Sequence, residues 1–362
     1  MQFIANGIME EINFKTIPMK KETLKASPKR KKIKTKPSRK TFKSRAIPFY
    51  GIGNTVQVPF DSVTVFDRIA NFLRKRSVQA SFNEEKSQII CKTSQFLTFS
   101  IDLYAGSDPD KTTIVEVIKR NGCSFAFRQE KEGVINAASE LDAEAISTTR
   151  SFNKVTCMKI PEELLSVYKP PNNSDLECIL DRAVDQLHTS HRDAKLFTLQ
   201  NLASMTKPDQ SHSGTATRMA KIIMGGNTII CDLITDIVVT SSGKQNEDDM
   251  SEQILNACLT ILSNSMTSMK NNSTGCLDTQ GYWFDIIISS LVDVVRSCKS
   301  THNAYLALKC ICLYIRSSTI ARKNISEMDV FNVIKLAEEH GKEVHLKLEK
   351  EARTALRELG CY

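Results

Sequence analysis

The sequence predicts a mainly α-helical protein that carries a smaller α+β domain near its N-terminus. Between about 59 and 146, one amphipathic helical segment is followed by segments in which apolar residues alternate with polar ones. From 175 to 360 the strand patterns disappear, and apolar residues recur at helical spacing. The 362 residues, with 41% hydrophobic and 25% charged side chains, are enough to bury two cores.

The positive charge of the chain is concentrated at its N-terminus. Residues 1–50 hold 14 Lys and Arg against 3 Asp and Glu, so the remaining 35 basic and 38 acidic residues nearly balance. Four prolines and the lack of a sustained apolar period predict a disordered basic tail over 1–58. Because the rest of the chain is nearly neutral, we expect nucleic acid to bind only non-specifically, through this tail.

Ten of the seventeen residues from 29 to 45 are Lys or Arg. The basic core behind Pro28 favours a nuclear localisation signal that an import receptor reads, and so a nuclear protein. The alternatives are a solubilising tail, or attraction to an anionic membrane surface at about 1 kcal/mol per basic residue, which would place the protein in the cytoplasm or on that surface. The residues of the core are Lys29, Arg30, Lys31, Lys32 and Lys34.

The α+β domain is expected over 59–146. An amphipathic helix should cover 59–78, with Asp61 as its N-terminal cap. Strands are expected at 78–82, 87–92, 96–104, 112–119 and 123–127, and a closing helix at about 129–146. A linker over 147–174, with a double proline at 170–171, separates this domain from the rest.

One stretch of this domain, Val115-Glu116-Val117-Ile118-Lys119-Arg120-Asn121-Gly122 followed by Phe125 and Phe127, resembles the kinase-associated KA1 domain over about 60–142. No kinase domain accompanies it, since the Gly-rich loop, HRD and DFG sequences are absent. The resemblance implies a docking or anionic-lipid-binding unit, against the alternative that its cations form a solvated face. The candidate lipid or phosphate contacts are Arg68, Arg74, Lys75, Arg76, Lys119 and Arg120.

The helical part contains two segments that align without gaps, at 194–203 and 257–266, and a third at 307–315 that keeps their apolar frame and has Tyr in place of Asn. Each combines a small residue with apolar residues at helical spacing, and the first two carry Asn at the eighth position. These segments resemble the last helix of an armadillo repeat over about 175–318, with terminal capping helices at 327–340 and 342–359. The resemblance implies an armadillo or HEAT-like right-handed superhelix over 175–362. Loops must be inserted at 205–215, 241–250 and 269–280, because the spacings of 63 and 50 residues exceed that of such repeats.

A row of asparagines on such a repeat would bind an extended peptide. Each side-chain amide both donates and accepts, so the row can hold a peptide backbone without reading its sequence. We expect Asn201 and Asn264 to do this, with Tyr314 as an aromatic wall. In the alternative, each Asn caps or solvates the end of its own helix.

No catalytic or metal-binding pattern is present in the sequence. The six histidines are scattered, the eleven cysteines sit singly in apolar runs, and no phosphate-binding, nucleotide-binding or metalloprotease motif appears, so no cofactor is expected. No apolar run is long enough to span a bilayer. We expect a non-catalytic scaffold that binds a partner protein or extended peptide. The alternative is a peripheral membrane scaffold that binds anionic phospholipid through the tail and the KA1-like domain.

Overall fold

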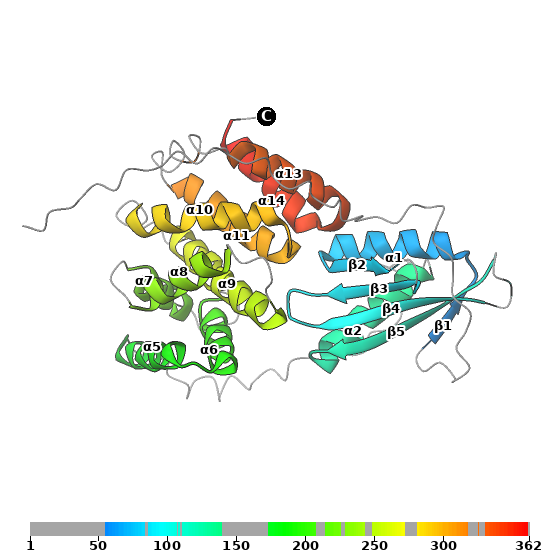
Figure 1. The fold of residues 1–362 in the computed structure, drawn as a ribbon, viewed down its shortest axis with the longest axis horizontal. Coiled ribbons are helices and arrows are strands. Elements are labelled where there is room, and N and C mark those ends of the chain that lie inside the picture. The colour runs from blue at the N-terminus through cyan, green and yellow to red at the C-terminus, as the bar shows by residue number, and fades with distance from the viewer. Residues whose placement is uncertain are drawn as a thin grey trace, which may run out of the picture. The chain divides into compact units, whose positions relative to one another are not determined.

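The computed structural model of the chain describes residues 55–83, 86–106, 108, 111–139, 173–207, 214–225, 229–242, 248–271, 281–317, 325 and 330–360. All of them belong to one compact unit that spans 35–362. The predicted localisation signal at 29–34 and most of the predicted linker lie outside the described residues. Figure 1 shows two regions, a sheet with two helices and a larger set of helices, as the sequence predicted.

The N-terminal region contains an antiparallel five-stranded sheet with the strand order β1-β5-β4-β3-β2. Helix α1 contacts β2 and β4, while α2 contacts β5 and packs on α1. Predicted and observed strand ends differ by at most two residues for four of the strands. The elements are β1 (Thr55–Val58), α1 (Ser62–Arg76), β2 (Gln79–Asn83), β3 (Gln88–Lys92), β4 (Thr98–Ala105), β5 (Thr113–Asn121) and α2 (Ser124–Ala138).

The start of α1 forms as its sequence predicts. The Asp61 carboxylate accepts hydrogen bonds from the backbone N–H groups of Val63 at 3.1 Å and Thr64 at 3.2 Å, which satisfies donors that have no partner within the helix. Residues at helical spacing then face the sheet, where Ile69 and Leu73 are buried against the apolar side of β4. The helix is therefore fixed to the sheet by its apolar stripe.

The C-terminal end of this region corrects the sequence interpretation. No strand covers 123–127, because the chain turns at Gly122, whose φ is 103°, and α2 begins at Ser124. Phe125 and Phe127 give the alternation of a strand, yet Phe127 packs edge to face on Phe99 of β4, with ring centroids 6.3 Å apart, from a helix. The fifth strand is instead β1, whose four residues pair with β5 and lie where the tail was predicted to end.

The C-terminal region consists of helical hairpins stacked in two layers. In one layer α6, α9, α11 and α14 contact one another in succession, and in the other α5, α8, α10 and α13 do so; α7 packs on α9. This stacking, in which each hairpin contacts its neighbours, is expected of an armadillo or HEAT-like array. The helices are α5 (Asn173–His188), α6 (Arg192–Met205), α7 (Thr215–Met224), α8 (Ile229–Ser242), α9 (Asp249–Asn271), α10 (Gly281–Ser297), α11 (Thr301–Ser317), α13 (Val330–Val344) and α14 (Leu346–Glu358).

The three aligned sequence segments occupy equivalent places in this stack. They lie within α6, α9 and α11, which are successive helices of the same layer. The apolar frame of each segment is buried in one continuous core, as at Leu199, Leu262 and Ile311. The three expected insertions fall between consecutive helices, where α6 ends at Met205, α8 at Ser242 and α9 at Asn271.

The last hairpin breaks at a different residue from the one predicted. The sequence placed the break between the capping helices at Gly341, but α13 continues to Val344 and the chain turns at His345. Gly341 is buried inside α13. A Cβ at this position would lie 2.5 Å from the backbone nitrogen of Glu349 in α14, which is too close for any residue other than glycine. This glycine therefore allows two helices to approach closely and does not end a helix.

Candidate interaction site

A groove of about 560 Å³ lies between α5, α7 and α8 of the helical region. A volume of this size is within the range of natural ligand pockets, which is roughly 300–1,000 Å³. Its lining has an acidic side and an apolar side. The lining residues are Glu177, Leu180, Asp181, Val184, Asp185, Ile222, Ile229 and Ile230.

The acidic side of the groove is built by a single helix. Glu177, Asp181 and Asp185 follow one another at intervals of four residues, so α5 presents all three carboxylates on one face. All three are exposed, and within the described residues none of them forms an ion pair or a hydrogen bond. Like charges at this spacing destabilise a helix by about 0.2–0.5 kcal/mol per pair. The chain thus retains a charged ladder that weakens its own helix.

The apolar side of the groove comes from three helices. Leu180 of α5 and Ile230 of α8 are buried and form its base. Val184 and Ile222 are partly buried, whereas Ile229, at the first position of α8, keeps 60% of its surface exposed. An isoleucine gains roughly 1.5–3 kcal/mol when it is fully buried, so this surface offers binding energy to a partner.

The predicted peptide-binding row is placed on neighbouring helices, but its three members differ. Asn201 of α6 is exposed to solvent. Asn264 of α9 is partly buried, and its amide donates to the carbonyl oxygen of Ala203 at 3.2 Å and to Thr206 Oγ1 at 3.4 Å, at the end of α6. Tyr314 of α11 is 6% exposed. Peptide binding by this row stays a prediction, and the contacts of Asn264 show that it also links α6 to α9.

Four of the predicted lipid contacts lie on α1, and of the three at its C-terminal end two already have acidic partners. Arg76 pairs with Glu130 at 2.8 Å, and Arg74 pairs with Glu349 of α14. Lys75 between them is exposed, with no ion pair or hydrogen bond to any described residue. Two of these three side chains are therefore already engaged within the protein.

The other three predicted lipid contacts also meet groups of their own domain. The Arg68 guanidinium lies 3.9 Å from the centre of the Phe60 ring. Lys119 donates to Ser124 Oγ at 2.7 Å, and Arg120 donates to Ser100 Oγ at 3.1 Å. Lipid binding by these residues stays a prediction. In the structure these three cations contact groups of their own domain.

Arg74 belongs to a set of contacts by which α1 meets the end of the helical region. Its Nε donates to the carbonyl oxygen of Lys342 at 2.6 Å, and its partner Glu349, whose side chain is 7% exposed, also pairs with Arg353 at 2.7 Å. A second contact joins Lys92 of β3 to Glu252 of α9 at 2.8 Å. Charge pairs and apolar packing thus act together at this junction.

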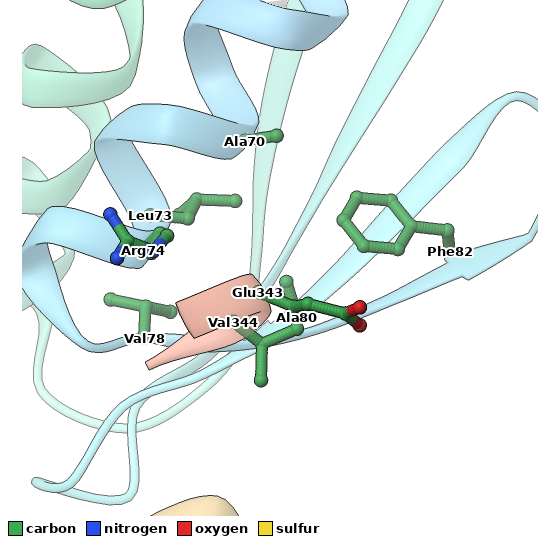
Figure 2. Close-up of a pocket in the computed structure, with 8 residues that line it drawn as sticks. All are labelled: Ala70, Leu73, Arg74, Val78, Ala80, Phe82, Glu343 and Val344. Atoms are coloured by element: carbon green, nitrogen blue, oxygen red, sulfur yellow. The ribbon is translucent and has the colours of Figure 1, made fainter. Parts of the chain in front are cut away.

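Figure 2 shows the small cavity beside Arg74, where side chains from α1, β2 and the C-terminal end of α13 meet. Its volume of about 20 Å³ leaves room for no more than about one water molecule. Six of its eight lining residues are apolar, and the other two are Arg74 and Glu343. It is a packing gap between elements, and the groove on α5 is therefore the stronger candidate for binding.

Some polar residues were not singled out by sequence reasoning. Asn256 of α9 donates to Asn303 Oδ1 of α11 at 2.7 Å, and both side chains are buried. The pair joins α9 to α11, two helices of the same layer. The acidic ladder of α5 was missed too, although its four-residue spacing was readable from the sequence.

The described part of the chain was compared with the requirements of a metal site and of a membrane-spanning helix. No group of three or more His, Cys, Asp or Glu residues there has the arrangement of a metal site. No single helix among the described residues is long and apolar enough to cross a membrane. The pair α7 and α8 meets the length and composition required, but with a 75° bend between the two helices.

No known protein family matches this sequence, and no curated protein matches it. Among solved structures, the chain is similar to the designed armadillo repeat protein YIII(Dq)4CqI, with 10% sequence identity and a TM-score of 0.21. The match covers 49% of this chain and 98% of the designed chain. A TM-score this low carries no argument about function, which must come from the contacts of the chain itself.

Proposed function

We propose that this protein is a non-catalytic scaffold that binds a partner protein on its helical repeat and enters the nucleus by means of its basic tail. The observation that carries the proposal is the groove between α5, α7 and α8, which combines an open volume of about 560 Å³ with unpaired carboxylates and an exposed isoleucine. Exposed apolar surface beside polar groups is typical of interaction sites.

The groove is better suited to binding than to a reaction. Its polar groups are three exposed carboxylates of one helix, and no His, Cys, Ser or Lys is among its lining residues. Acid or base catalysis depends on groups that are held in a water-excluding site, and nucleophilic catalysis requires a nucleophile with a base. The apolar side instead offers the type of surface on which protein partners pack.

Proximity labelling with the full chain tests the binding part of the proposal. The parent protein is compared with a groove variant, Asp181→Lys with Ile229→Asp, and with the control Glu339→Gln on the exposed face of α13. We expect proteins that are labelled by the parent and the control to be lost with the groove variant. If all three proteins label the same neighbours equally, the groove is not the binding surface.

Fluorescent fusions test the second part. Alanine at Lys29, Arg30, Lys31, Lys32 and Lys34 removes five positive charges, so nuclear accumulation should fall towards an even distribution. Ser27, Ser38 and Thr41 are kept in this variant, and a control replaces only Lys15 and Lys20, which lie outside the basic core. Nuclear signal that persists in the five-residue variant, or a signal at the plasma membrane, would contradict nuclear import through this segment.

A further inference from the structure

The polar and apolar sides of the groove define what kind of partner segment fits. From this we infer that the groove binds an amphipathic α-helix of a partner protein whose apolar face is flanked by Lys or Arg residues. This inference rests on the proposed function, since it names the partner class for the same site. It is argued from the charge of the groove, the chemistry of its lining and the spacing of its carboxylates.

Charge complementarity determines the sign of the charge on the partner segment. Three carboxylates and no basic residue line the groove, and the carboxylates are unpaired with any described residue. Arg182 and Lys221 are exposed on the same helices but do not line it. A cationic segment would therefore bring the opposite charge that the acidic ladder lacks, whereas an acidic one would add like-charge repulsion.

The lining also decides between a helical and an extended partner. An extended peptide presents unpaired N–H and C=O groups, and the C=O groups need hydrogen-bond donors. Carboxylates only accept, and the other five lining residues are Leu, Val and Ile, so no lining side chain can donate. A helix satisfies its own backbone groups and needs only apolar and charged contacts, which are what the groove provides.

The spacing of the carboxylates fits such a helix. From Glu177 to Asp185 the ladder extends about 12 Å along α5, at 1.5 Å per residue. Basic residues four apart on a partner helix that lies along α5 have the same repeat of about 6 Å. The apolar face beside them would then pack on Val184, Ile222 and Ile229, as a third helix packs into the groove between two others.

The inference is tested by fluorescence anisotropy on the purified full chain. The probe is a labelled 18-residue peptide with Leu along one helical face and Lys on both flanks. A twin carries Glu at every Lys position, and a third peptide has the composition of the probe in an order that destroys the amphipathic face. We expect the probe to bind and both other peptides to bind at least roughly tenfold more weakly, because each removes one of the two complementary features.

Variants assign the binding to the groove. Asp181→Asn with Asp185→Asn should weaken probe binding roughly five- to tenfold, since each exposed ion pair contributes a few-fold at most. Ile229→Ser should weaken it roughly tenfold through lost apolar contact. The matched control Glu339→Gln on α13 removes one exposed carboxylate elsewhere and should leave binding unchanged.

Three outcomes would overturn the inference. The acidic twin binds as tightly as the probe, or the double asparagine variant binds like the parent, or the probe binds only when the basic residues from 29 to 45 are replaced by serine. The last result would assign the groove to the tail of the chain itself. If groove variants lose their neighbours in proximity labelling but the probe shows no preference over its twin, the scaffold stands and the partner chemistry is wrong.

Discussion

The buried His345 and the partly buried His302 should make the stability of this protein depend strongly on pH. His345 precedes α14, where its Nδ1 accepts the backbone N–H of Leu348 at 3.1 Å, and it is fully buried. Burial, the neighbouring His302 and Lys347 lower the pKa of His345 to about 3. Burial and Lys347 lower the pKa of His302, whose ring centre lies 6.1 Å from that of His345, to about 4.

The sign of the effect follows from these depressed pKa values. In the unfolded chain both histidines have a pKa near 6.5 and take up a proton below it, whereas in the folded chain they stay neutral. The stabilisation is therefore complete above pH 6.5 and is lost as the pH falls towards 3. At pH 5, which is 1.5 units below 6.5, protonation of His345 in the unfolded chain should lower the free energy of unfolding by about 2 kcal/mol, at 1.36 kcal/mol per unit. The contribution of the partly exposed His302 should be smaller.

The measurement is urea unfolding of the full chain at pH 7 and pH 5 at constant ionic strength, followed by circular dichroism. The variant His345→Asn keeps a side chain that caps a helix and removes the titrating group. Its loss of unfolding free energy between pH 7 and pH 5 should be smaller than that of the parent by about 2 kcal/mol. The exposed His188→Asn is the matched control and should behave like the parent.

The comparison removes the contribution of carboxylates, because they are the same in both proteins. If the parent and His345→Asn lose equal stability between the two pH values, the histidine at the α13–α14 turn is not held neutral by burial.

Three further predictions concern packing, the junction and thiol reactivity. Gly341→Ala should lower the free energy of unfolding by about 1–3 kcal/mol, because its Cβ would clash with the backbone of Glu349; an unchanged urea midpoint would show that the two helices are farther apart. Arg74→Met should cost about 1–3 kcal/mol by removing a partner of the buried Glu349 carboxylate, and in a double-mutant cycle with Glu349→Gln the two losses should not add; additive losses would contradict the ion pair. Cys123 should react with iodoacetamide at pH 7.5 at least roughly tenfold faster than Cys91, because backbone N–H groups at the start of α2 lower the pKa of the exposed Cys123 thiol while burial raises that of Cys91; equal rates by mass spectrometry would refute this.

Much of the architecture was predictable because it depends on the periodicity of apolar residues. The Asp61 cap, the four strands β2 to β5 and the helices α6, α9 and α11 all follow from local patterns that the structure confirms. These patterns are reliable where a face of a helix or strand must be buried in a continuous core.

The errors arise where tertiary contacts override a local pattern. The segment 123–127 alternates like a strand, but Phe127 reaches Phe99 from a helix because the turn at Gly122 redirects the chain. Gly341 resembles a helix end, although it serves the close approach of α13 to α14. Phe99 lies in a different element from Phe127, and Glu349 lies in the helix after Gly341, so neither contact follows from the local pattern around the residue.

The candidate site was harder to predict than the fold. The asparagines suggested a peptide-binding row on successive helices. The sequence could not show that the side-chain amide of Asn264 donates hydrogen bonds to the end of α6. The acidic residues of α5 were readable as a ladder, but a groove beside them needs α7 and α8 to be placed there by long-range packing. Sites between elements therefore require the structure.

The position of the groove has a consequence for how the stack opens. Hairpin α5–α6 is at one end of the described helical array, with neighbours on only one side, so it should separate from the array before the central hairpins do. The groove includes residues of both α5 and α8, which belong to different hairpins. A bound helix would hold these two hairpins together, so binding should slow amide exchange in α5 first. The affinity for the helix and the opening of hairpin α5–α6 would then be thermodynamically coupled.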